Sequence, residues 1–329
     1  MRFFCMNNLP LELFNRNSFQ SLDSTEKTKL MEHLAKLYDL SFIGLQSFAR
    51  WGQSLTTGVF TKGERRMVFV PGDTITIGWD HFVQGIDKDN LELITEVLEE
   101  YEIEDSCEDF IKNMMLPPFS ATISPMIVSE QLEEIGYLAI SKDDSRLNQR
   151  DRKELANFLS SDCEELEIVN HVRFRKEAGE CKIWLYEETS LSTLKQSLQD
   201  QGLTLPSANE WAYLAGGGCR TLFAFGDNLD FNMRLHHFSG SEQADQPFDL
   251  QEPNFFGLSI AYDPYQKELV DGQSKTTCGG DGGCNICGGL GPMVGYLPCS
   301  PHYKPQEHKS DLINGGYEFV RPIIRISKD

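Results

Sequence analysis

The sequence contains no long apolar run. Nowhere do eighteen apolar residues occur together, and the opening Met-Arg-Phe-Phe-Cys-Met is followed at once by Asn7 and Asn8. The first absence speaks against a membrane-spanning helix, and the second speaks against a signal peptide. We therefore expect a soluble, cytoplasmic protein that has no membrane partner.

Positive charge is also scarce. Thirty lysines and arginines face fifty aspartates and glutamates, so the formal net charge at pH 7 is −20. Such a charge repels the phosphates of nucleic acids and of anionic lipids, and we expect neither as a partner. One stretch is richer in arginine, but the carboxylates around it indicate a solvated face rather than a basic groove. Its arginines are Arg146, Arg150, Arg152, Arg173 and Arg175.

The cysteines do not follow the pattern of a disulfide-stapled secreted domain. They number nine, which is odd, and five of them are scattered singly. The other four fall between residues 278 and 299. Two of these, Cys284 and Cys287, lie in the tract GGDGGCNICGG at 279–289, where six of eleven residues are glycine. Glycine is costly in a regular helix or strand, so the tract predicts a loop with special backbone geometry.

The residues that are present predict a folded protein that begins with helix. Hydrophobic residues make up 40% of the 329 residues and aromatic residues 11%, as in globular proteins. Asp23 and Glu26 have the spacing of a capping box, and apolar residues then recur at roughly helical spacing as far as Gly52. We therefore expect a mainly helical segment over residues 1–66.

From Met67 the apolar period changes to two, which predicts a hairpin around a Pro71-Gly72 turn. The later pattern alternates short helices and strands. It predicts an acidic helix from Asn90 towards Tyr101 with Leu91, Ile94, Val97 and Leu98 buried, a strand ending near Ile123, a helix beginning at Ser129 and a short strand at Cys181 to Tyr186.

Six short motifs resemble, in the same order, those of the formylglycine-generating-enzyme (sulfatase-modifying-factor) family. One of them is LTLPSANEWAYLAGGG at 203–218, which is similar to the family signature Arg-Leu-Pro-Thr-Glu-Ala-Glu-Trp-Glu-Tyr-Ala, with Thr204 and Ser207 as departures. The other five are FVPGDTITIG, ISPMIVSEQLEEI, FAFGD, EPNFFGL and EFVRPIIRI. The positions that match the signature are Leu205, Pro206, Ala208, Glu210, Trp211, Tyr213 and Ala215.

The resemblance covers residues 67–329 and implies a fold class. It implies an irregular, loop-rich α+β fold related to C-type lectins, here preceded by the helical segment 1–66. Such a fold contains many turns that need positive φ, which explains glycine-rich stretches. The family also implies an oxidase, in which two cysteines bind copper and oxidise a substrate cysteine to formylglycine.

The chain keeps only part of that copper motif. Cys284 stands where the first cysteine belongs, but the second would fall at Gly289, and Cys287 is only three residues on. Cys278 replaces an expected basic residue, and SIAYDPYQKELVDG replaces an aromatic segment. We therefore expect the oxidase to be lost, although the thiols of Cys284 and Cys287 suit Cu(I).

Three further hypotheses concern the same cysteines. Cys284 and Cys287 have zinc-knuckle spacing, and Cys278, Cys299 or His302 could complete a zinc site. A redox disulfide between Cys284 and Cys287 is the second hypothesis. Free thiols packed in a tight loop are the third, because cysteine is among the most buried residue types, and this explanation is favoured over any single alternative.

Other candidate ligands are weaker. His236 and His237 could face a cleft, but paired loop histidines are more often exposed. Five side chains could supply oxygen ligands to calcium, although local backbone hydrogen bonds are the favoured role of such turn residues. They are Asp227, Asn228, Asp230, Asp263 and Asp271.

Two functional hypotheses follow. The favoured one is a divergent family member without oxidase activity that binds an unknown protein or small-molecule ligand. The alternative is a copper-dependent oxidoreductase that oxidises a thiol through Cys284 and Cys287.

Overall fold

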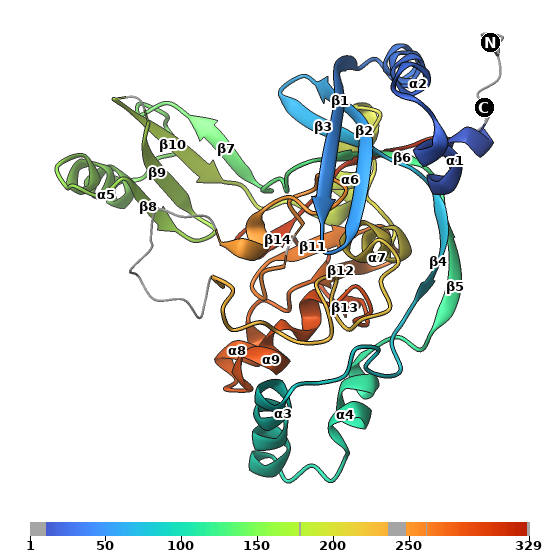
Figure 1. Ribbon diagram of the computed structural model, residues 1–329. Coiled ribbons are helices and arrows are strands. Elements are labelled where there is room, and N and C mark those ends of the chain that lie inside the picture. The colour runs from blue at the N-terminus through green and yellow to red at the C-terminus, as the bar shows by residue number, and fades with distance from the viewer. Residues whose placement is uncertain (1–10, 178, 236–247, 261, 328–329) are drawn as a thin grey trace.

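The computed structural model describes residues 11–177, 179–235, 248–260 and 262–327 (Figure 1). It is a mixed α+β structure whose strands form several sheets, most of them antiparallel. The helices are short, and long loops connect many of the elements. No helix in the described parts of the chain is long and apolar enough to cross a membrane.

The largest sheet joins strands from the beginning and the end of the chain (Figure 1). All its neighbouring strands pair antiparallel. Its central strands are almost wholly buried, as apolar runs covered on both faces require. In order across the sheet, the strands are β1 (Ser41–Arg50), β2 (Gln53–Lys62), β3 (Arg65–Val70), β6 (Met126–Ser129) and β15 (Ile323–Arg325).

The N-terminal segment is helical only in its first part. After α1 (Arg16–Ser21), helix α2 (Ser24–Leu37) begins at the predicted capping box, in which Asp23 and Glu26 exchange hydrogen bonds. The predicted helix towards Gly52 is wrong, because residues 41–62 form the hairpin β1–β2. Its burial is partial and irregular, so the sequence lacks the clean alternation of a strand. Strand β2 also pairs with β3, so this segment shares a sheet with the rest of the chain.

Two predictions around the next strands are also wrong. Pro71 and Gly72 do not turn a hairpin: β3 pairs with β2 and β6, whereas β4 (Asp73–Ile77) pairs with β5 (Phe119–Ile123) in a separate two-stranded sheet. The chain therefore changes sheets at this dipeptide. No helix begins at Ser129, which instead ends β6. Residues 126–129 form a strand because they are buried and pair with β3 on one side and β15 on the other.

Two helices project at the lower end of the view in Figure 1. They are α3 (Lys88–Glu100) and α4 (Cys107–Met114). The acidic helix predicted from the sequence is thus confirmed as α3, with Ile94, Val97 and Leu98 buried. Leu91 departs from the prediction, because it is 39% exposed.

Residues 137–186 form a second layer with its own hydrophobic cluster. The predicted strand Cys181 to Tyr186 is confirmed within β10, the central partner of β7 and β9. The arginines of this region pair with carboxylates, for example Arg173 with Glu134 at 2.6 Å. The elements are β7 (Tyr137–Ile140), α5 (Gln149–Leu159), β8 (Glu165–Ile168), β9 (Val172–Glu177) and β10 (Glu180–Tyr186).

The last third of the chain packs around α7 (Ala208–Gly216). Ser207 and Glu210 close a capping box at its start, and Trp211 and Leu214 are buried. These side chains belong to the same hydrophobic cluster as Cys278, at the end of β12 beside the glycine tract. The other elements are α6 (Leu191–Asp200), η3 (Asp249–Gln251), β11 (Lys267–Val270), β12 (Lys275–Gly279), α8 (Cys284–Cys287), α9 (Gly291–Tyr296), η4 (Leu297–Cys299), β13 (Gln306–His308) and β14 (Glu318–Phe319).

Candidate functional site

The backbone of the glycine tract lies in close contact with the loop that contains Pro264 and Tyr265. A Cβ added at Gly280 would lie 2.3 Å from the Pro264 carbonyl oxygen, and one added at Gly283 would lie 2.2 Å from the Tyr265 ring. The Gly280 N–H also donates to the Gln266 carbonyl at 2.7 Å. Close approach of two backbones therefore explains Gly280, and positive φ (+78°) adds to it at Gly283.

Cys284 and Cys287 are exposed and lie one turn apart on α8. The hypothesis of buried thiols is therefore wrong for these two residues. Asp281 holds the start of the turn, because its carboxylate accepts hydrogen bonds from the N–H groups of Cys284 and Asn285. The Cys287 Sγ lies 3.2 Å from the Tyr265 hydroxyl oxygen, and this hydrogen bond raises the pKa of Tyr265. Two neighbouring thiols suit a soft ion, so this pair fits two-coordinate Cu(I).

The other proposed zinc ligands are buried or already hydrogen-bonded. Cys278 and Cys299 are buried, and burial raises the pKa of both thiols. His302 accepts from the Gly78 N–H at Nδ1, and its Nε2 lies 3.1 Å from the Thr221 carbonyl oxygen. Within the described residues, no three His, Cys, Asp or Glu are placed to hold one metal ion. The five residues therefore do not assemble the tetrahedral site of structural zinc.

The candidate calcium ligands serve local structure. The Asp227 carboxylate is buried and accepts from the N–H groups of Gln84 and Leu222, at 2.5 and 2.7 Å. Asp271 pairs with Lys195 at 2.7 Å. The remaining three, Asn228, Asp230 and Asp263, accept hydrogen bonds from the nearby main-chain N–H groups of Asp87, Asn232 and Tyr265. His236 and His237 lie outside the described residues.

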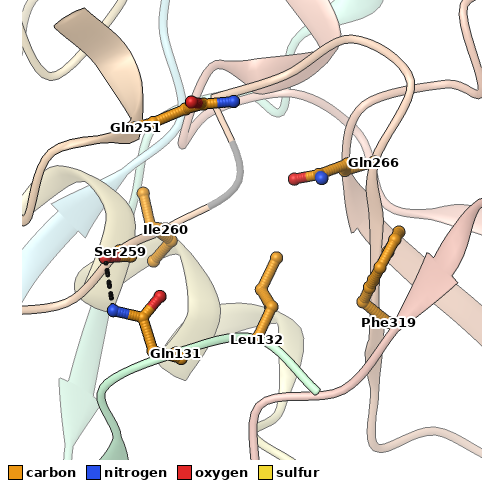
Figure 2. A pocket seen from close by; sticks show the side chains of 7 residues that line it. All are labelled: Gln131, Leu132, Gln251, Ser259, Ile260, Gln266 and Phe319. Carbon is orange, nitrogen blue, oxygen red and sulfur yellow. Dashed lines mark hydrogen bonds between the residues drawn. The ribbon is translucent and has the colours of Figure 1, made fainter. Parts of the chain in front are cut away.

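A separate pocket of about 310 Å³ lies between four segments of the chain (Figure 2). Figure 2 shows Gln251 and Gln266 on two sides of the hollow, with Leu132 and Ile260 pointing into it. The Gln131 amide donates to the Ser259 hydroxyl at 3.0 Å on one wall. Among the residues that the structure describes, the lining of the pocket holds no ionisable side chain; it consists of Gln131, Leu132, Gln251, Ser259, Ile260, Gln266 and Phe319.

A buried ion pair fixes two walls of this pocket. Arg321 and Glu268 have no exposed side-chain surface, and Arg321 Nε lies 3.1 Å from the Glu268 carboxylate. The same guanidinium donates to the carbonyls of Ser129, Glu130 and Ser259 at 2.9, 3.1 and 2.6 Å. It thereby joins the segment before Gln131 to the segment that carries Ser259 and Ile260.

Hydrogen bonds from two other segments hold the remaining walls. The glycine tract holds Gln266, through the hydrogen bond from Gly280. The tip of the β1–β2 hairpin holds Gln251: Arg50 donates to the carbonyls of Asp249 and Glu252 on either side of it. At this tip Trp51 has φ +49° and packs edge-on against Tyr262, with ring centroids 5.4 Å apart.

The side chains of the pocket suit a ligand that carries no charge. Among the described residues, the side-chain amides of Gln251 and Gln266 make no hydrogen bond to protein, so each offers donors and an acceptor to a ligand. Leu132, Ile260 and Phe319 supply apolar surface beside them. This mixture suits a small uncharged molecule with both polar groups and an apolar face.

No protein-family model matches the chain, and no curated protein sequence matches it significantly.

Proposed function

We propose that this chain is a divergent member of the formylglycine-generating-enzyme-like proteins that binds a small uncharged ligand in the pocket of Figure 2. The order of the six sequence motifs supports the family proposal. The capping box at Ser207 and Glu210, within the motif at 203–218, also supports it. Both are consistent with a loop-rich α+β architecture.

One observation carries the binding proposal. On a chain of net charge −20, the described residues that line the pocket offer only amides, a hydroxyl and apolar groups. Arg321, which donates to carbonyls of two pocket walls, is paired with Glu268. A charged ligand would have to lose its hydration without gaining an ionic partner, which is costly. A ligand such as a sugar or a small amide would meet matching donors and acceptors.

Calorimetric titration with N-acetylglucosamine, which carries hydroxyls and an amide, tests this proposal. We expect binding by the wild type, at least tenfold weaker binding by Gln266→Ala, and little binding of the charged 6-phosphate of the same sugar. Gln199→Ala, an exposed residue of α6 outside the pocket, is the matched control. Absence of binding, or equal affinity for the neutral and charged sugars, would contradict the proposal.

A second candidate function rests on the exposed pair of thiols. Cys284 and Cys287 are accessible and one turn apart, as a copper-dependent oxidation of an incoming thiol would require. Bound copper would supply one-electron chemistry with oxygen, and the chain's own part would be to hold the ion and leave it accessible.

Metal analysis of protein purified without added metal tests the second candidate. Copper near one equivalent that is lost in both Cys284→Ser and Cys287→Ser would support it. Protein without copper, or copper retained by both variants, would contradict it. Cys163→Ser, which removes another exposed thiol, is the control.

A further inference from the structure

The helical arm formed by α3 and α4 concentrates the negative charge of the molecule. Residues 87–112 hold eleven carboxylates and two lysines, so nearly half of the net charge of −20 lies in this short stretch. All eleven carboxylates are exposed. The arm is anchored through α3, which packs against α9, and by the Tyr101 hydroxyl, which donates to the Gly288 carbonyl at 3.0 Å.

A groove of about 320 Å³ runs along the exposed side of α3. Asp89, Glu92, Leu93 and Glu96 line it from the helix, at spacings that place them on one face. Phe231 and Pro292 line it from the opposite side. We call these six residues the α3 groove.

The floor of the α3 groove is unusual for a solvated surface. Phe231 is 46% exposed, although an aromatic side chain of this size is normally buried. With Leu93 and Pro292 it forms an apolar strip beside three carboxylates. An acidic face that only contacts solvent does not require an apolar strip, and a purely apolar contact does not require carboxylates. The combination therefore indicates a partner that carries both cations and apolar groups.

Most carboxylates of the groove form no ion pair with the described residues, so they can pair with a partner. Within the described residues, the ion pair of this groove joins Lys88 Nζ to Glu92 at 3.3 Å, and both side chains are more than half exposed. Such an exposed pair contributes little and exchanges readily with another cation. Asp89 and Glu96 have no ion pair among the described residues.

We propose that the α3 groove docks a positively charged segment of a partner protein, with an apolar side chain of that segment on Phe231. Asp89 and Glu96 are seven residues apart, about 10 Å along the helix. A partner segment in the polyproline II conformation places two cations three residues apart on one face, about 9 Å from each other. The segment Lys-apolar-apolar-Lys therefore matches both the charges and the apolar strip.

Charge excludes the other macromolecular occupants. Nucleic acid and anionic membranes would be repelled by the arm. A second copy of the chain carries the same net charge, which repels it from the arm, and its Arg173 and Arg175 already pair with Glu134 and Glu165.

The test uses the whole protein and the peptide Gly-Lys-Leu-Phe-Lys-Gly, capped at both ends and labelled with an uncharged fluorophore. Fluorescence anisotropy measures its affinity at 50 and 300 mM NaCl. We expect binding that weakens with salt, and a dissociation constant at least tenfold higher in the double variant Glu92→Lys/Glu96→Lys.

Two controls separate docking from general attraction to the arm. Glu100→Lys/Glu104→Lys makes the same change of charge outside the groove and should raise the dissociation constant less than threefold. Phe231→Ser should raise it at least threefold at both salt concentrations, because it removes the apolar contact. Melting temperatures of all variants confirm that each is folded.

Four results would overturn the proposal. They are no binding of the peptide, equal binding of a peptide with glutamates in place of its lysines, equal effects of the two double variants, and no effect of Phe231→Ser. None of them bears on the neutral pocket, which lies in another part of the molecule and takes an uncharged ligand.

Discussion

At the scale of single residues, Arg321 is the group on which the pocket most depends. It is wholly buried, pairs with Glu268 and donates to three carbonyls of the pocket walls. Arg321→Met breaks this buried ion pair, which costs about 3–5 kcal/mol. We expect urea unfolding to show this loss. Arg175→Met, which breaks an exposed pair with Glu165, should cost less than about 1 kcal/mol, and equal losses would contradict the account.

His302 makes a prediction about pH. Burial lowers its pKa from 6.5 to about 4, and Arg220 adds to this effect. Between these values the unfolded chain binds a proton that the folded protein does not, so stability falls as the pH is lowered from 6.5 towards 4. The full effect is about 3 kcal/mol.

Urea unfolding at pH 7 and pH 5 tests this prediction. Glutamine can keep the hydrogen bond to Thr221 but does not titrate, so His302→Gln should lose about 2 kcal/mol less than the wild type between these two pH values. Parallel pH profiles in the two proteins would show that His302 is not the group responsible.

At the scale of elements, the glycine tract makes a matched pair of predictions. Gly280→Ala places a Cβ against the backbone of Pro264 and displaces the loop that carries Gln266. It should cost about 2–3 kcal/mol, as overpacking does, and weaken ligand binding. Gly289 has φ +81° but open space around it, so Gly289→Ala should cost about 1 kcal/mol. Urea unfolding measures both, and an equal cost would contradict the role assigned to close approach.

Elements with strong local signals were predicted from the sequence. The capping box at Asp23 predicted the start of α2, and the apolar stripe predicted α3. Elements stabilised by distant partners were not. Strand β6 is a strand because β3 and β15 lie on either side of it, and these neighbours are distant in the sequence.

At the scale of the whole molecule, the two candidate sites differ in how far the sequence could reveal them. The thiol pair stands out because Cys284 and Cys287 are neighbours in the sequence. The neutral pocket draws its lining from four distant segments, and glutamines in loops follow no recognisable spacing. Arg321, which pairs with Glu268 across 53 residues, joins two of these walls, and the glycine tract and Arg50 hold the others.

The proposed small ligand and the proposed basic protein segment bind at separate places on the molecule. The uncharged pocket and the acidic α3 groove lie on different elements and select opposite chemistries. A small ligand and a basic segment of a protein could therefore occupy the molecule together.

The most direct measurement follows the side-chain amide signals of Gln251 and Gln266 by nuclear magnetic resonance during titration with N-acetylglucosamine, with Gln266→Ala to assign them. The account predicts saturable shifts of both signals, and no shift of the main-chain amides of Cys284 and Cys287. Unmoved glutamine signals, or shifts centred on the thiol turn, would contradict it.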